Sequence, residues 1–464
     1  MNMRSILPAK FFGKRFFCNL LRRVSFAMLV AFVAATACRT VAAAAPADSS
    51  AWVDANLDSL IDLYHHLHQT PELSLHEKET AARIAAELKS AGLTVTTGVG
   101  GHGVVGVLRN GPGKTLMLRT DLDALPVVEE TGLPYASKVR TKDDRGATVG
   151  VMHACGHDLH MTNLVAVTRY LASHRDAWSG TLVVIGQPAE ERGAGARAML
   201  DDGLFSRFPR PDYAVALHVG SELPPGKIEC RPGYAQANVD SVDVTIKGRG
   251  GHGAAPDTTI DPIVIAARLV LDLQTIVSRE MKPIDPAVIT VGSIHGGSKH
   301  NIIGDECKLQ ITVRSYTPEV REKLLSAIRR KASAAAASSG APEPVVAVSE
   351  DTPAVFNDPE LTERVVATIK KVLGDENVSE AKLSMGGEDF SRYGLASVPI
   401  CMFRLGTVDQ SRLDEFKDKG QSPPSLHSPF YYPNAEASLR ASVPAMVAVA
   451  IDLLPPQDAS ANGE

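Results

Sequence analysis

The sequence of 464 residues is poor in cysteine and in positive charge, and it has no low-complexity segment or internal repeat. Six cysteines are too few for a disulfide-dense scaffold. The chain has 48 basic and 53 acidic residues, which gives a formal charge of −5. It therefore lacks the excess of basic residues that is typical of a nucleic-acid-binding protein. Hydrophobic residues make up 44% of the chain and charged residues 22%, which is typical of a globular protein. At roughly 150 residues per domain, the length allows two to three domains.

Residues 1–44 differ from the rest of the chain. They contain seven basic residues and no acidic one, and Val24 to Ala37 form an apolar run. A run of about 14 residues is short for a membrane span, and the small residues 42–45 that follow are typical of a secretory signal cleaved near Ala44. An uncleaved anchor and a lipoprotein signal at Cys38 are the alternatives. We therefore expect an exported protein, periplasmic or secreted, whose mature chain has 41 basic and 53 acidic residues and a net charge of −12.

Apolar runs of strand length alternate with helical stretches in the first half of the mature chain. Continuous apolar strands of this kind are typical of a mainly parallel sheet that helices cover on both faces. The sequence therefore predicts an α/β catalytic domain whose first part spans residues 51–236. Its predicted strands are Val104–Leu108, Thr115–Leu118, Thr181–Ile185 and Tyr213–Leu217.

The segment 237–350 has a different pattern, with the order βαββαβ. Its two helices are predicted to begin after Asp261-Pro262 and Thr317-Pro318, because a capping residue followed by proline is typical of a first helical turn. The order is that of a ferredoxin-like module. We expect an inserted lid or dimerisation domain whose exposed sheet edge can pair with a second copy in a homodimer. Residues 351–458 then complete the catalytic domain, and 459–464 form a tail.

Polar side chains follow the predicted strands of the catalytic domain. Asp121, Glu190, Glu191 and His218 all come at the ends of strands, where open α/β sheets bind their ligands. Cys155 and His157 stand two residues apart at the start of a predicted helix and can face the same crevice. Thiolate, imidazole and carboxylate groups together are the ligands of a Zn²⁺- or Mn²⁺-type centre.

Each of these residues taken alone also has a structural interpretation. A buried cysteine is usually a small apolar side chain, and a histidine in an apolar strand is often a hydrogen-bonded core residue. The adjacent Glu190 and Glu191 argue for a functional site, because two acids in an apolar context cost desolvation energy unless a cation or protons compensate.

Eight short motifs occur in order along the mature chain. They are His66 to Ser74 (HLHQTPELS), Arg119 to Pro126 (RTDLDALP), Met152 to His160 (MHACGHDLH), Gln187 to Glu191 (QPAEE), Gly250 to Pro256 with Asp261-Pro262, Asn301 to Ile303 with Thr312 to Arg314, Met385 to Phe390 (MGGEDF) and His427 to Pro429. In these motifs the sequence resembles metallopeptidase family twenty, the aminoacylase and carboxypeptidase group. Within it, the resemblance is to the subgroup of hippurate hydrolases and auxin-conjugate (indole-acetyl-amino acid) amidohydrolases. Asp257 and Gly304 depart from the family pattern of His and Pro.

The resemblance implies a role for each matching residue. It implies a centre of two divalent metal ions per subunit (Mn, Zn or Co), with Glu190 as the general acid/base and Asp121 as the carboxylate that orients the site. His252 resembles the lid histidine that reaches the scissile carbonyl, often across a dimer, while Asn301 and Arg314 resemble the groups that hold the substrate's free carboxylate. The implied metal ligands are Cys155, His157, Glu191, His218 and His427, with Cys155 as the bridge.

The predicted function is therefore a metal-dependent amidohydrolase that cleaves N-acyl amino acids or short peptides. Two alternatives remain open at this point. One is a thiol hydrolase with Cys155 as nucleophile and His157 as base, which leaves Glu190, Glu191 and His427 without a task. The other is a metal-binding protein without turnover, which does not need Glu190. No nucleic-acid partner and no membrane span of the mature chain are expected.

Overall fold

The computed structural model describes residues 45–457. The predicted signal at 1–44 and the tail at 459–464 lie outside the described residues. Among the helices that are described, none is both long and apolar enough to cross a membrane.

The catalytic domain is built on an eight-stranded sheet with the order β1-β2-β6-β3-β7-β18-β8-β17. The four central strands β6, β3, β7 and β18 are mutually parallel, while β1 and β2 extend one edge in antiparallel fashion. The predicted mainly parallel, helix-covered sheet is confirmed. The strands are β1 (Thr94–Val99), β2 (Gly103–Asn110), β3 (Thr115–Asp121), β6 (Gly180–Gln187), β7 (Tyr213–Gly220), β8 (Ile228–Cys230), β17 (Val378–Glu380) and β18 (Ile400–Gly406).

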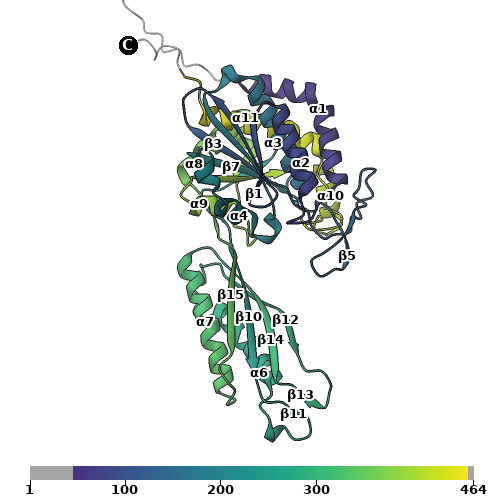
Figure 1. Cartoon of the computed structure of the whole chain (residues 1–464), viewed down its shortest axis with the longest axis vertical. Coiled ribbons are helices and arrows are strands. Elements are labelled where there is room, and N and C mark those ends of the chain that lie inside the picture. Colours follow the sequence, from purple (N-terminus) through teal and green to yellow (C-terminus); the bar gives the residue numbers. More distant parts are fainter. Residues whose placement is uncertain (1–44, 458–464) are drawn as a thin grey trace, which may run out of the picture. The chain divides into compact units, whose positions relative to one another are not determined.

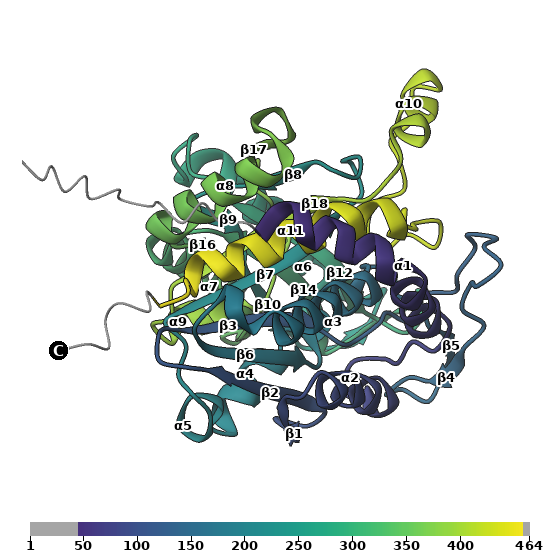
Figure 2. The same ribbon diagram turned by 90° about the horizontal axis from the view of Figure 1, so that it is seen from above.

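Five helices cover one face of this sheet. Alternate strand residues such as Leu118, Val184 and Phe403 pack there against apolar helix residues in one large core. The first and last described helices, α1 and α11, pack against each other and lie side by side in Figures 1 and 2. The five are α1 (Ala45–Gln69), α2 (Lys78–Ser90), α3 (His157–Ser173), α8 (Pro359–Leu373) and α11 (Ala435–Leu453).

Shorter helices cover the opposite face. The intervening strand residues, among them Met117, Ile185 and Met402, pack there in a second apolar cluster. The covering helices are α4 (Gly195–Asp201), α5 (Leu204–Arg207) and α9 (Ser391–Leu395). Because both faces are covered, the central strands are mainly apolar, and most of their polar side chains lie toward their carboxyl ends.

The lid forms a separate four-stranded sheet with the order β12-β14-β10-β15, which is the strand order of a ferredoxin-like fold (Figure 1). Asp261 and Thr317 cap the starts of its two helices, each followed by proline at the first turn, as the sequence predicts. Both helices pack on one face of the sheet. The elements are β10 (Asn238–Lys247), α6 (Pro262–Thr275), β12 (Val288–Gly296), β14 (Glu306–Ser315), α7 (Pro318–Ala337) and β15 (Val345–Thr352).

Small elements join these parts. The lid also carries the two-stranded pair β11 (Gly251–His252) and β13 (Ile302–Ile303), and β9 (Gly233–Gln236) pairs with β16 (Val355–Asn357). Two polar segments of the sequence, 139–149 and 409–425, contain a hairpin of β4 (Arg140–Lys142) with β5 (Thr148–Gly150) and the helix α10 (Gln410–Asp418).

Candidate metal centre

The predicted ligands and Asp121 come from five places in the chain that meet at the carboxyl ends of the parallel strands. His218 lies near the end of β7, and Asp121 is the last residue of β3. Cys155 and His157 lie at the start of α3, where a left-handed glycine, Gly156, separates them. Glu191 lies in the short 3₁₀ turn after β6, and His427 lies in the loop before α11.

Among the described residues, five groups of three side chains have ligand atoms close enough to hold an ion, within 4.8 Å of one another in each group, and two of these groups share Cys155. Cys155, His157 and His218 form one group, and Cys155, Glu191 and His427 form the other. The Cys155 Sγ atom belongs to both. The predicted role of Cys155 as a bridge between two ions requires a sulfur atom that belongs to two such groups.

Two buried polar atoms at this place lack the hydrogen bond that burial normally requires. They are Nε2 of His157 and Oε1 of Glu191, which lie 3.8 Å apart and have no hydrogen-bond partner among the described residues. An unsatisfied buried donor or acceptor costs about 1–3 kcal/mol. The donor set and its two unsatisfied atoms therefore fit divalent cations at this position.

The electrostatics of the site also favour a cation. Burial and the neighbouring Glu388 and Glu191 raise the pKa of Glu190 well above its usual range. Burial likewise raises the pKa of Glu191 to about 7, although His157 acts in the opposite direction. Burial raises the pKa of the Cys155 thiol well above normal, with contributions from Glu191 and Glu190. Burial and these two carboxylates thus disfavour the thiolate form of Cys155, which argues against a thiolate nucleophile.

A second layer of side chains orients the predicted ligands. The Asp123 carbonyl holds Nδ1 of His157 at 2.8 Å, so the Nε2 atom is directed into the centre. The Asp123 carboxylate accepts hydrogen bonds from the Ser74 hydroxyl at 2.6 Å and from the Glu191 backbone N–H at 3.0 Å. The Asp121 carboxylate binds Nδ1 of His160 at 2.7 Å.

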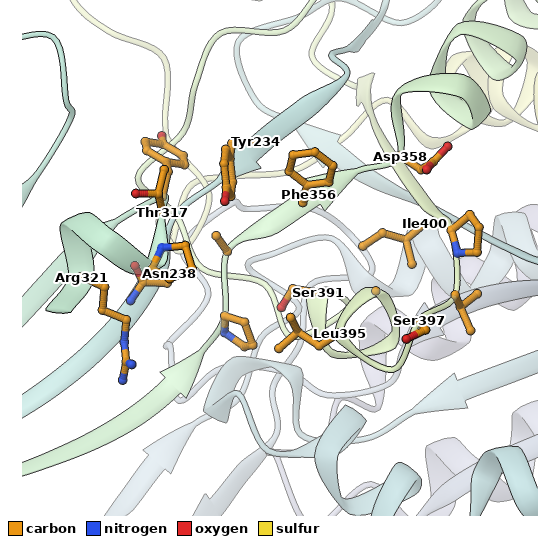
Figure 3. A pocket seen from close by; sticks show the side chains of 17 residues that line it. Tyr234, Asn238, Thr317, Arg321, Phe356, Asp358, Ser391, Leu395, Ser397 and Ile400 are labelled. Carbon is orange, nitrogen blue, oxygen red and sulfur yellow. The ribbon is translucent and has the colours of Figure 1, made fainter.

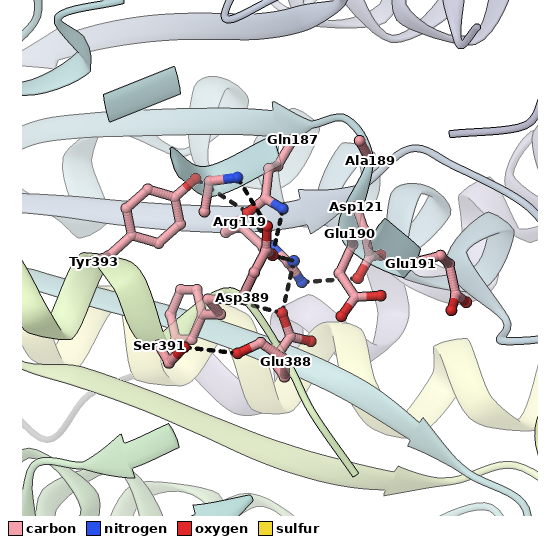
Figure 4. A network of polar contacts seen from close by, with 12 residues as sticks. Arg119, Asp121, Gln187, Ala189, Glu190, Glu191, Glu388, Asp389, Ser391 and Tyr393 are labelled. Carbon is pink, nitrogen blue, oxygen red and sulfur yellow. Dashed lines mark hydrogen bonds and ion pairs between the residues drawn. The ribbon is translucent and has the colours of Figure 1, made fainter. Parts of the chain in front are cut away.

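Arg119, which lies inside the sheet, connects several of these supporting side chains (Figure 4). Its buried guanidinium donates to Asp121 at 2.7 Å, to Glu388 at 2.8 Å and to Asp389 at 3.3 Å. Asp389 also accepts the side-chain amide of Gln187 at 2.6 Å. Segments nearly 270 residues apart in sequence, β3 and the loop before α9, are thereby fixed behind Glu190.

Two non-glycine residues at the site have left-handed backbone conformations. Ala189, directly before Glu190, has φ 50°, and His427 has φ 67°. Such conformations cost of order 1–3 kcal/mol and persist where surrounding contacts enforce them. At His427 the backbone N–H donates to the Ala154 carbonyl at 2.9 Å, which brings the imidazole next to the Cys155 loop.

The three site residues predicted in the lid, the catalytic His252 and the substrate-binding Asn301 and Arg314, do not lie at one place. Arg314 lines the same 380 Å³ cavity as Cys155, His218 and His427, and it donates to the Met385 carbonyl at 3.1 Å. His252 and Asn301 do not line this cavity. Both are exposed, and they meet where β11 pairs with β13, with the Asn301 carbonyl accepting the Gly253 N–H at 2.9 Å.

A second cavity of 590 Å³ lies where the lid strands leave the catalytic domain (Figure 3). The aromatic side chains of Tyr234, Tyr316 and Phe356 form part of its wall. None of the predicted ligands lines it. The chemistry therefore belongs to the smaller cavity.

Several residues of the centre have no role assigned from the sequence, although all of them except Glu77 stand in the motifs quoted above. Among them, His160 stands in the motif MHACGHDLH, and the adjacent acids Glu388 and Asp389 stand in the motif MGGEDF. The structure shows that these two acids precede α9, are fully buried and bind Arg119. An arginine inside an otherwise apolar strand was the available signal, because a buried guanidinium requires acidic partners. The other unassigned residues are Glu77, Arg119, Asp123 and Gln187.

The fold and the centre define a metallohydrolase class with an α/β catalytic domain and an inserted ferredoxin-like lid. Comparison with known proteins identifies the family. The profile of Peptidase family M20/M25/M40 matches residues 117–419, so the chain belongs to this family.

Relatives of known name agree with this assignment. The chain is 37% identical over 359 residues to Thermostable carboxypeptidase 2 of Saccharolobus solfataricus, covering 76% of this chain and 87% of the relative. It is 33% identical over 388 residues to IAA-amino acid hydrolase ILR1-like 2 of Arabidopsis thaliana, covering 82% of each. A solved structure from Bacillus subtilis, YXEP, described as a dinuclear metal binding peptidase from M20 family, superposes with a TM-score of 0.71 at 28% identity, covering 87% of this chain and 100% of that one. The resemblance to the hippurate and auxin-conjugate hydrolase subgroup is confirmed.

Proposed function

We propose that the protein hydrolyses the amide bond of N-acyl amino acids or short peptides, with Glu190 as general base and two divalent ions (Mn, Zn or Co). The observation that carries this proposal is the convergence of Cys155, His157, Glu191, His218 and His427 around atoms that lack hydrogen-bond partners, with Glu190 beside them. The names of the relatives, a carboxypeptidase and an amino-acid-conjugate hydrolase, support an amide substrate with a free carboxylate.

Divalent ions at this site supply a Lewis acid for the carbonyl and lower the pKa of a water molecule. Glu190 then has a separate task from its neighbour Glu191. Its carboxylate accepts the proton of the attacking water and delivers it to the leaving nitrogen. Burial and the neighbouring Glu388 and Glu191 raise the pKa of Glu190, which favours the uptake of a proton from water by its carboxylate.

Arg314 is proposed to hold the free carboxylate of the substrate. Its guanidinium lies in the wall of the cavity that contains Cys155 and His218, at the junction of the lid and the catalytic domain. A guanidinium can hold a carboxylate with two parallel hydrogen bonds, which fixes the orientation of the scissile bond.

His252 and Asn301 are proposed to act from the lid of a second subunit. They are exposed and remote from the cavity lining, whereas β12 forms an open edge of the lid sheet with the exposed side chain of Ile294. An open edge can pair with the same edge of a second copy. His252 would then donate to the oxyanion and Asn301 would bind the substrate.

Export to the periplasm or the medium is also proposed, on the basis of the basic and apolar segments of residues 1–44. Amino-terminal sequencing of the protein recovered from the producing cells tests it. A mature chain that begins near residue 45 is expected. A chain that begins at Met1 in the cytoplasm would contradict it.

Amine release measures the proposed reaction directly. The panel contains N-acetyl, N-benzoyl and indole-acetyl amino acids together with dipeptides, and it is assayed with chelated protein before and after addition of Mn²⁺, Zn²⁺ or Co²⁺. We expect turnover that requires metal and that falls by about 10²–10⁴-fold in Glu190→Gln, whose metal content stays unchanged. Turnover that persists in chelator and is lost on thiol alkylation would instead indicate a Cys155 nucleophile. Metal binding with no turnover on any substrate would indicate a binding protein.

A further inference from the structure

Three side chains lie in a row across three neighbouring strands beside the metal centre. His218 on β7 is in register with Arg404 on β18, and Arg404 is in register with Glu229 on β8. All three line the 380 Å³ cavity. Arg404 therefore stands one strand away from a predicted metal ligand.

The direction of the Arg404 side chain follows from the alternation along β18. Cys401, Phe403 and Leu405 pack into the core under α11, whereas Met402 packs on the opposite face. Residue 404 shares the face of Met402 because successive strand residues point to opposite sides. This face is apolar until its carboxyl end, where His218 and Arg404 are the first polar groups, so the guanidinium faces the site.

Arg404 does not form a close ion pair with Glu229. The nearest Glu229 carboxylate oxygen lies 3.9 Å from its Nη1 atom, which is beyond hydrogen-bond distance, and the Arg404 side chain is 33% exposed. A partly desolvated guanidinium with donors directed at a cavity is suited to bind a carboxylate, preferably in two-point geometry.

The charge of the surrounding cavity supports the same ligand. Besides Arg404, its wall carries Arg231, Arg314 and Lys382, and Glu229 is the acid among the lining residues outside the metal centre. Arg231 and Arg314 each donate to a backbone carbonyl at the rim, which fixes their positions. A cavity whose lining carries four cationic side chains and one acidic side chain outside the metal centre attracts anionic ligands. A single substrate carboxylate bound by Arg314 would leave Arg404, which lies beside His218, without a function.

We propose that Arg404 is a specificity-determining residue that binds a second carboxylate of the substrate. The preferred substrates are then N-acyl amino acids or short peptides with two carboxylates, the second one on the acyl group or on the amino-acid side chain. This inference rests on the proposed amidohydrolase function and adds the substrate class.

The test compares substrates that differ only in a carboxylate and its neutral amide. One pair is N-succinyl-leucine and N-succinamoyl-leucine, in which the acyl group changes, and the other is N-acetyl-glutamate and N-acetyl-glutamine, in which the side chain changes. We expect kcat/KM for the acid to exceed that for the amide by about 10-fold or more in one pair, since a hydrogen bond to a charged group contributes about 1.5–3 kcal/mol. The pair that shows the preference identifies the position of the second carboxylate.

Variants then assign the preference to Arg404. Arg404→Met is expected to bring the acid-to-amide ratio to about one, and Glu229→Gln is expected to increase the ratio because it removes the competing carboxylate. Arg364→Met, at an exposed pair with Asp452, is the matched control and leaves the ratio unchanged. A wild-type ratio near one in both pairs, or an unchanged ratio in Arg404→Met, would overturn the proposal.

A binding measurement separates this proposal from the proposed function. Calorimetry of metal-loaded protein compares glutarate with its monoamide, and it requires no turnover. Tighter binding of glutarate that is lost in Arg404→Met supports the second carboxylate site even if no amide is hydrolysed. Equal binding of the two compounds would overturn the second carboxylate site. In that case, hydrolysis of the neutral amides would still support the proposed amidohydrolase function.

Discussion

The Glu77 carboxylate accepts a hydrogen bond from the backbone N–H of Ala189 at 2.7 Å, and Ala189 directly precedes Glu190. The same oxygen accepts the Leu75 N–H at 2.9 Å, and the side chain is fully buried. Because Ala189 has a left-handed backbone, the turn that presents Glu190 needs a contact of this kind. Glu77 thus positions the turn that carries Glu190, the proposed general base.

The Glu77→Ala variant should lose turnover through a displaced Glu190. We expect kcat to fall by about 10- to 100-fold with little change in KM, since a small displacement of a catalytic group lowers the rate steeply. Glu77→Gln, which keeps an oxygen acceptor for the Ala189 N–H, is the matched control and should retain most of kcat. Steady-state kinetics and metal analysis of both variants check this. Equal losses in the two variants would show that the hydrogen bond is not what positions Glu190.

Glu77 also gives the protein a pH-dependent stability. Burial raises the pKa of Glu77 to about 7, and the nearby Asp123 adds to the shift. A carboxyl whose pKa is higher in the folded than in the unfolded state stabilises the fold at low pH, and this contribution is lost between about pH 4.5 and 7. Urea unfolding of metal-free protein should therefore show the stability of Glu77→Gln rising relative to wild type over this range, by on the order of 3 kcal/mol. A difference that does not change with pH would contradict the raised pKa.

Arg119 should be essential for stability. Its fully buried guanidinium is bonded to Asp121, Glu388 and Asp389, and its removal leaves three carboxylates without their cation. We expect Arg119→Met to lower the free energy of unfolding by about 3–5 kcal/mol. Arg364→Met removes an arginine from an exposed pair and should cost less than about 1 kcal/mol. Similar values for the two variants in urea unfolding would argue against the buried network.

Metal removal should destabilise the protein even without any substrate present. A cation that binds only the folded state at 100 times its Kd adds about 2.7 kcal/mol to the free energy of unfolding. Thermal unfolding should therefore shift upward when Mn²⁺, Zn²⁺ or Co²⁺ is added to chelated protein, and metal analysis should give two ions per chain. His218→Ala should reduce the metal content and the shift. An unchanged midpoint with metal would indicate that the unsatisfied atoms of His157 and Glu191 are not ligands.

The sequence predicted the fold because the fold depends on local patterns. Apolar runs with polar residues at their ends marked the central strands, and Asp261-Pro262 and Thr317-Pro318 marked the two lid helices. The first two described helices, α1 and α2, are separate because the loop between them carries Pro71 and the left-handed Leu75.

These local patterns could not predict contacts between segments that are distant in the sequence. Nothing local in the sequence indicates that Arg119 binds Glu388, or that Glu77 supports Ala189, because each pair is separated by more than 100 residues. The register of β7, β18 and β8, which places Arg404 between His218 and Glu229, likewise depends on the assembled sheet.

The proposed action of His252 across a dimer predicts complementation between two inactive variants. Glu190→Gln lacks the base but has an intact lid, and His252→Ala lacks the lid histidine but has an intact metal centre. If the lid of one subunit serves the site of the other, a mixed dimer contains one complete site. Random mixing of equal amounts makes half of the dimers mixed, so about a quarter of wild-type activity should return.

Subunit exchange at low protein concentration, followed by assay and light scattering, measures this recovery. His252→Ala alone is expected to lose about 10²–10³-fold in kcat, as for other oxyanion donors, with its metal content intact. Mixing either variant with inactive protein of its own kind is the control and restores nothing. No recovery in a protein shown to exchange subunits would mean that His252 acts within its own subunit. The lid would then have to move toward its own catalytic domain, since His252 does not line the cavity that contains Cys155 and His218.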